Sequence, residues 1–126
     1  MKCFPLILVV ALITAVANCT LVYGQDSKNA SACQDIITNS STSTLTDRID
    51  GYYFAALCYW KIGDGDNAML AFAKAEVLGR KTAKNSTAIK AREGLEKLYR
   101  SLHNNLTIGI EKVYRRAEDS LSESDK

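Results

Sequence analysis

The stretch that decides the fold runs from residue 51 to residue 79 and reads GYYFAALCYWKIGDGDNAMLAFAKAEVLG. On both sides of the central GDGD segment, apolar residues recur at steps of three and four, which is the period of an α-helix. Small alanines interleaved with large aromatics allow two helices to pack closely. The stretch therefore predicts a helical hairpin, with helices over about 46–62 and 67–78.

The boundaries of these two helices have recognisable residues. Thr44 is a suitable N-cap for the first helix. Gly63 ends it, because glycine tolerates the left-handed backbone of a helix exit. Asp66 is the predicted N-cap of the second helix, and Gly79 is predicted to terminate it.

The flanking segments are also helical in pattern. We expect a short helix over 28–38, a Ser/Thr-rich loop over 39–45 and a helix over 86–103 capped by Asn85 or Ser86. A last helix follows a predicted cap at Thr107. No segment alternates with a period of two, so we predict an all-α fold. Its expected parts are a signal peptide (1–24), a short helix and loop (25–45), the hairpin (46–82), capping helices (83–121) and a frayed tail (122–126).

Large and small residues follow a set order along the hairpin. Counted from Ile49, bulky Tyr52 comes first and Tyr59 holds a later aromatic position. Two alanines lie between these tyrosines, and two more lie in the second helix on either side of Phe72. This order resembles one tetratricopeptide repeat (TPR), a helix-turn-helix unit of 34 residues. The matching positions are Tyr52, Ala55, Ala56, Tyr59, Ala68, Phe72 and Ala75.

The resemblance covers one repeat only. Ala55 is smaller than the Leu usual in the family, and Arg80 stands where Pro is usual. The pattern does not recur upstream or downstream, and the helix over 86–103 is similar to the capping helix of such arrays. A generic alanine-rich hairpin would pack in almost the same way and remains an alternative.

The resemblance implies that the protein binds a protein or peptide partner and does no catalysis. Repeats of this family bind peptides in a groove formed by their first helices. The corresponding groove residues here are Tyr52, Tyr53, Tyr59, Lys61 and Asn67. Alternatively, these aromatics pack against the first short helix. Because one repeat does not bury both of its faces, we also expect a weak homodimer.

The N-terminus has the pattern of a secretory signal. Met1 and Lys2 precede an apolar segment over 5–17, followed by small residues. Cleavage is expected after Gly24, although Ala15-Val16-Ala17 also fits the A-x-A pattern. Alternatively, the segment is a buried strand. The protein is thus expected to be periplasmic or extracellular, in the style of a bacterial protein. A second hypothesis is an envelope-anchored lipoprotein scaffold lipidated at Cys19, which would bring the chain to a membrane.

Two cysteines remain after the expected cleavage, Cys33 and Cys58. In an exported small domain they favour one disulfide, which would tie the short helix to the hairpin. Two buried free thiols are the alternative. Two cysteines with the single His103 lack the spacing of a metal site, so no metal and no cofactor are expected.

The charges argue against a nucleic-acid partner, because the formal net charge is only +2. One local excess of positive charge lies between Arg80 and Arg100. It is explained either as a solvated helix face or as a surface for an acidic partner or an anionic membrane. His103 is interpreted as a helix-end residue, and no nucleophile motif is present, so the chain is not expected to be an enzyme.

Overall fold

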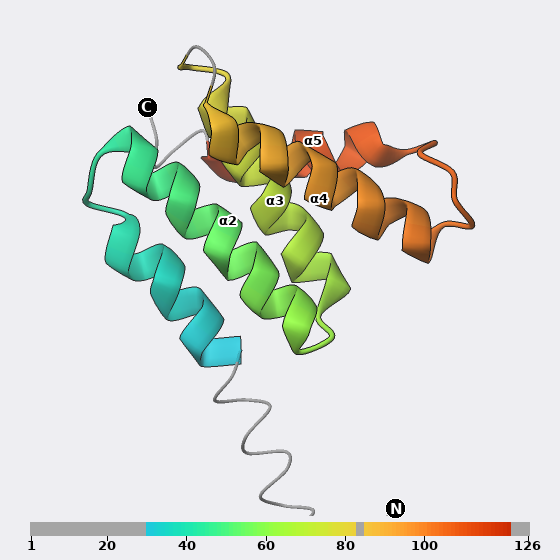
Figure 1. The fold of residues 1–126 in the computed structure, drawn as a ribbon, viewed down its shortest axis with the longest axis horizontal. Helices are drawn as coiled ribbons and strands as arrows, with labels where there is room; N and C mark the ends of the chain where they lie inside the picture. The colour runs from blue at the N-terminus through green and yellow to red at the C-terminus, as the bar shows by residue number, and fades with distance from the viewer. Residues whose placement is uncertain (1–29, 83–84, 122–126) are drawn as a thin grey trace, which may run out of the picture.

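The structure is a computed structural model that describes residues 30–82 and 85–121. Within those ranges the fold is all-α, as predicted, and no strand occurs (Figure 1). The expected signal peptide, its cleavage sites, Cys19 and the tail over 122–126 lie outside the described residues. An N-terminal helix over residues 30–40 precedes α2 (Leu45–Lys61), α3 (Gly65–Gly79), α4 (Ser86–Leu102) and α5 (Ile110–Leu121).

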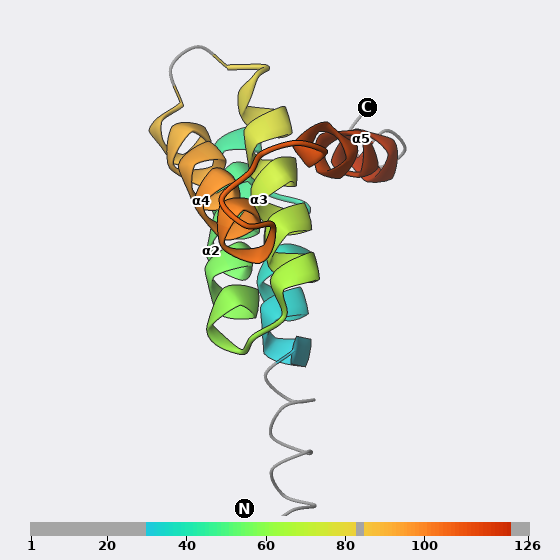
Figure 2. The same ribbon diagram turned by 90° about the vertical axis from the view of Figure 1, so that its right-hand side faces the viewer.

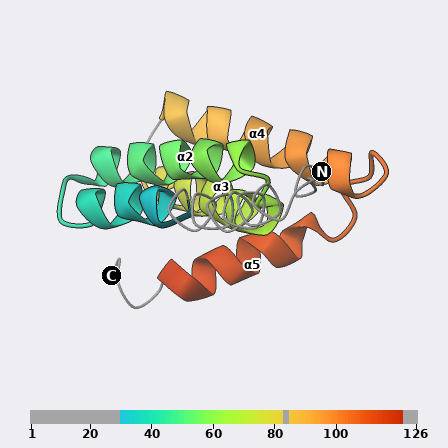
Figure 3. The ribbon, with the colours of Figure 1, turned by 90° about the horizontal axis from the view of Figure 1, so that it is seen from below.

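Helix α3 is the centre of the fold, since it packs against α2, α4 and α5. Figures 2 and 3 show α4 on one side of α3 and α5 on the opposite side. The N-terminal helix runs beside α2 (Figure 1). A helix enclosed on several sides needs small residues where its neighbours approach. The buried alanines of α3 meet this need: Ala68, Ala71, Ala73 and Ala75.

The helix caps follow side-chain chemistry, with one correction. Thr44 accepts a hydrogen bond from the Asp47 N–H at 3.2 Å, as predicted. The predicted cap at Asp66 is wrong, because the carboxylate of Asp64 accepts the Asn67 N–H at 3.2 Å. Gly63 alone takes up the left-handed turn, with φ 86°, so the next helix starts two residues earlier than expected.

In the pair formed by α4 and α5, one predicted N-cap is confirmed and the other is wrong. Asn85 caps α4, accepting the Ala88 N–H at 2.9 Å. Thr107, however, is not the cap of α5. Its carbonyl accepts the Ile110 N–H in a turn that precedes the helix, and Gly109 follows with φ 92°. Helix α5 therefore begins only at Ile110, after a glycine that reverses the chain.

Gly79 ends α3 as predicted, but not through a left-handed backbone, which among the described glycines occurs at Gly63 and Gly109. A Cβ atom at Gly79 would instead collide with the Cβ of Ala88 on α4. Gly51 has the same role beside the side chain of Ser40. These glycines are required because neighbouring helices approach them closely.

A disulfide joins Cys33 to Cys58, with their Cα atoms 5.5 Å apart, and so ties the N-terminal helix to α2 as predicted. The N-terminal helix reaches residue 40, beyond the expected end at residue 38. The hydroxyl of Ser40 donates to the carbonyls of Ile36 and Ile37, both at 3.1 Å. The serine side chain thus bonds to carbonyl groups in the last turn of the helix instead of ending the helix earlier. The loop that follows is therefore shorter than predicted.

Candidate functional site

The seam between α2 and α4 is built around Phe72 of α3, which is fully buried. The rings of Tyr53 and Trp60 on α2 each lie 5.9 Å from the Phe72 ring, Trp60 edge-on at 87°. From α4, a Cβ atom at Gly94 would come within 2.8 Å of the Phe72 ring carbons. The absence of a side chain at Gly94 therefore lets α4 close over the ring.

A strip of apolar side chains runs along α2 on the solvent side of this seam. Phe54 is 56% exposed and Leu57 is 38% exposed, although both stand on a well-packed helix. Leu57 lies one turn from both Tyr53 and Trp60, and Tyr53 contacts Phe54 edge-to-face at 5.7 Å between ring centres. We name Tyr53, Phe54, Leu57 and Trp60 the α2 strip.

Positive charge borders the α2 strip on the α4 side. Lys90 and Lys97 stand four residues before and three residues after Gly94, so they share its flank of α4. Both are exposed. Lys61 stands four residues after Leu57 and is also exposed, at the end of α2. The strip thus combines an apolar centre with a basic edge.

The structure divides the five residues predicted to line a groove into two groups. Tyr53 belongs to the α2 strip, and Lys61 continues its helix face. The other three lie toward the N-terminal helix and α3. Tyr59 and Asn67 line a small hollow of about 50 Å³ there, and the Lys74 ammonium lies 5.5 Å from the Tyr52 ring centre.

Tyr59 is held in the interior rather than presented to solvent. It is only 6% exposed, and its hydroxyl donates to Oε1 of Gln34 on the N-terminal helix at 3.3 Å. Burial, with the nearby charge of Asp64, raises the pKa of its phenol. The alternative interpretation of the aromatics, packing against the first helix, therefore describes Tyr59. Whether any of the five residues binds a partner stays a prediction.

Sequence reasoning missed three residues of this surface: Phe54, Leu57 and Gly94. The signal was present in part, since Phe54 and Leu57 fall on the polar side of the helix wheel defined by Asp50 and Lys61. An apolar residue on such a face has no core to enter. Gly94 carried no such signal, because its role depends on the position of Phe72 in another helix.

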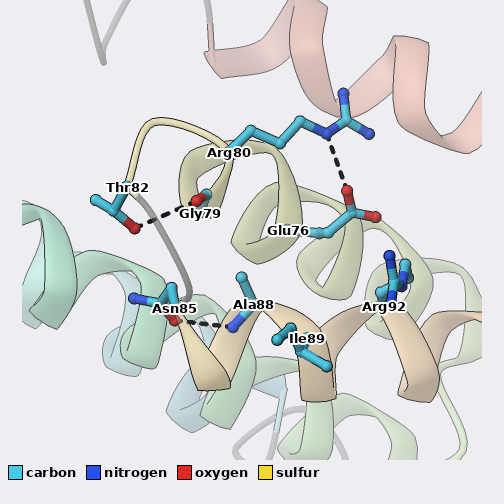
Figure 4. A pocket seen from close by; sticks show the side chains of 8 residues that line it. All are labelled: Glu76, Gly79, Arg80, Thr82, Asn85, Ala88, Ile89 and Arg92. Carbon is cyan, nitrogen blue, oxygen red and sulfur yellow. Dashed lines mark hydrogen bonds and ion pairs between the residues drawn. The ribbon is translucent and has the colours of Figure 1, made fainter.

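A second hollow, of about 190 Å³, lies between α3 and α4 (Figure 4). Two of its charged lining residues, Glu76 and Arg80, already interact with each other and with α5. Arg80 pairs with Glu76 at 2.9 Å and lies 5.2 Å from the Tyr114 ring centre. Burial first, and then Glu76, raises the pKa of Tyr114. The lining residues are Glu76, Gly79, Arg80, Thr82, Asn85, Ala88, Ile89 and Arg92.

A metal site and a membrane-spanning helix are both absent from the part of the chain that the structure describes. Among those residues no group of His, Cys, Asp and Glu side chains is arranged to hold a metal ion. None of the described helices is both long and apolar enough to cross a bilayer. A scan against protein-family models and searches of curated proteins and of solved structures found no match to this chain.

Proposed function

We propose that this protein is a non-catalytic adaptor that binds a partner protein through the α2 strip. The observation that carries the proposal is the exposure of Phe54 and Leu57 beside Tyr53 and Trp60 on a helix that is otherwise well packed. Aromatic and aliphatic side chains held on a rigid helix are typical of the anchor residues that dominate protein interfaces.

The partner best suited to this surface is an amphipathic helix or extended segment with acidic residues beside its apolar ones. The apolar residues would cover the α2 strip, and the acidic ones would face Lys90 and Lys97 on the neighbouring edge. A TPR-like hairpin, which remains part of the proposal, would present its first helix to a partner in the same way.

The strip needs little ordering before it binds. Helix α2 is tied to the N-terminal helix by the Cys33–Cys58 disulfide, and Tyr53 and Trp60 are fixed against Phe72. A preorganised surface loses less conformational entropy on association than a flexible one. This supports binding of a defined partner rather than general adhesiveness.

We also propose that the adaptor works outside the cytoplasm. The disulfide supports this, because such bonds persist in oxidising compartments. The alternative is the lipoprotein scaffold anchored through Cys19. Incorporation of a labelled acyl chain into the wild-type protein, but not into Cys19→Ser, would favour the scaffold. An unlabelled protein with a new N-terminus would favour the secreted adaptor.

The proposal is tested by capturing partners from the envelope fraction with matched variants. Phe54→Ala/Leu57→Ala removes the exposed centre of the α2 strip, whereas Ile89→Ala removes a comparably exposed apolar residue elsewhere, on α4. We expect the partner to be lost with the first variant and kept with the second. A photo-reactive residue at position 57 should cross-link the same partner directly. Retention of all partners by the double variant would disprove the proposal.

A second copy of the chain is one possible partner, given the weak homodimer expected from the sequence. Sedimentation at tens of micromolar separates the cases. A dimer that disappears in Phe54→Ala/Leu57→Ala would make self-association the role of the strip. A strict monomer would remove the homodimer and leave a different protein as the partner.

A further inference from the structure

A second set of exposed apolar side chains lies where α4 ends and the chain turns into α5. Leu102 is 53% exposed, Leu106 is 54% exposed and Ile108 is 80% exposed. We name these three residues the apolar tip. Figure 1 shows the loop between α4 and α5 projecting at the right-hand end of the molecule, beyond the packed helices. The loop that carries the tip therefore stands out from the packed helices.

The loop that carries the apolar tip is folded rather than slack. The Tyr99 hydroxyl donates to the Ile108 carbonyl at 2.7 Å, and the His103 ring stacks on the Tyr99 ring at 3.9 Å between centres. Asn104 and Asn105 have φ of 53° and 64°, and the turn closes with a Leu106 N–H bond to the His103 carbonyl at 3.0 Å. Leu106 and Ile108 are thus held outward by the backbone of the turn.

Basic side chains flank the apolar tip along the chain. From residue 97 to residue 116 the chain has five basic residues and one acidic one, Glu111, while Glu93 and Glu96 line a hollow on α4 together with Lys97 and Arg100. All five basic residues are exposed, on α4 before the loop and on α5 after it. An exposed apolar tip within a basic collar has the chemistry of a protein that touches an anionic lipid surface. The five residues are Lys97, Arg100, Lys112, Arg115 and Arg116.

We propose that the apolar tip inserts into the interface of an anionic membrane while the basic collar binds its head groups. The projecting loop favours this occupant, because a bilayer interface admits a projecting wedge, whereas a protein would need a matching pocket. The membrane contact uses none of the four residues of the α2 strip, and it shares only Lys97 with the basic edge proposed for the adaptor.

The test uses the full chain with a fluorescent residue placed at the tip. Ile108→Trp reports on the tip, and Ile89→Trp is the control at the other end of α4, about 20 Å away by helix rise. Each variant is mixed with vesicles of phosphatidylglycerol and phosphatidylcholine that carry brominated acyl chains. The emission of Trp60, measured in the wild-type chain, is subtracted. Bromine quenches only tryptophans at the depth of the acyl chains.

We expect the tryptophan at position 108 to be quenched several-fold more strongly than the one at position 89. The quenching should fall on pure phosphatidylcholine and in high salt, since screening weakens the collar. Arg100→Glu/Lys112→Glu, made in the Ile108→Trp chain, should weaken binding by about fivefold or more for each charge removed.

Three results would overturn the proposal. Equal quenching at both positions would mean that the apolar N-terminal segment, not the tip, meets the lipid. Quenching independent of lipid charge would remove the role of the collar. Shielding of the tryptophan at position 108 without vesicles, growing with protein concentration, would make the tip an interface between protein molecules.

Discussion

Helix α2 carries aromatic residues on two faces, one of which is buried and the other exposed to solvent. Toward the N-terminal helix, Tyr59 is almost completely buried and hydrogen-bonded. Toward solvent, Phe54 is more than half exposed, although it lies only five residues away. Both residues are large aromatics of the same helix. The difference shows that residue type alone does not separate packing from recognition, because each face depends on which neighbouring helix reaches it.

The strongest challenge to this comparison is to remove the residue that supports the exposed face. Phe72 is fully buried and supports Tyr53 and Trp60 from below. We expect Phe72→Ala to lower the free energy of unfolding by about 3–5 kcal/mol, as aromatic truncations in cores do. Urea denaturation followed by circular dichroism measures this. A loss below about 1 kcal/mol would mean that the seam is not tightly packed.

Removing the disulfide tests the buried face of α2 separately from the exposed one. Cys33→Ser/Cys58→Ser opens a loop with a sequence separation of 25 residues and should cost about 3 kcal/mol in the chain-entropy model. The N-terminal helix should then protect Tyr59 less well, which hydrogen exchange would detect. Unchanged stability would show that helix packing alone holds the N-terminal helix in place.

The exposed face should respond in the opposite way. Phe54→Ala/Leu57→Ala should change the free energy of unfolding by no more than about 0.5 kcal/mol per site, as surface substitutions do. Loss of partner affinity should instead reach about 2 kcal/mol if these side chains are anchor residues. Calorimetric titration with the captured partner measures the second quantity. A large loss of stability would place Phe54 and Leu57 in the core.

Alkaline pH gives the smallest effect and concerns buried phenols. In the folded chain the pKa values of Tyr59 and Tyr114 are raised above 10.0, mainly by burial. Above about pH 10 the unfolded chain therefore loses protons that the folded chain keeps. Stability should be complete below that pH and fall as pH rises, by at most about 1.4 kcal/mol per pH unit for each tyrosine. Urea titrations at pH 9 to 11 would show a flatter loss in Tyr59→Phe.

Much of the fold was predictable, because its signals are local. Helix periodicity, the Thr44 cap and the Asn85 cap depend on residues within one turn of each other. The Cys33–Cys58 disulfide followed from having two cysteines in the expected mature chain. The errors at Asp66 and Thr107 are of another kind. In both places a neighbouring glycine with positive φ reset where the helix begins.

The candidate site was predictable only in part. Tyr53 and Lys61 were identified by resemblance and lie on or beside the α2 strip, whereas Phe54 and Leu57 were not. A helix with apolar residues on most of its circumference does not reveal which side will remain uncovered. The packing of the neighbouring helices decides which side of α2 remains exposed.

The amino-acid sequence by itself determined the helices, the caps at Thr44 and Asn85 and the disulfide, since each depends on chemistry within a turn or on the count of cysteines. The tertiary structure decided which aromatics are buried and which face solvent. The N-terminal helix and α3 both pack against α2, and α4 closes over Phe72 at Gly94. Such contacts depend on the distances between helices, and the periodicity of a single segment does not predict those distances.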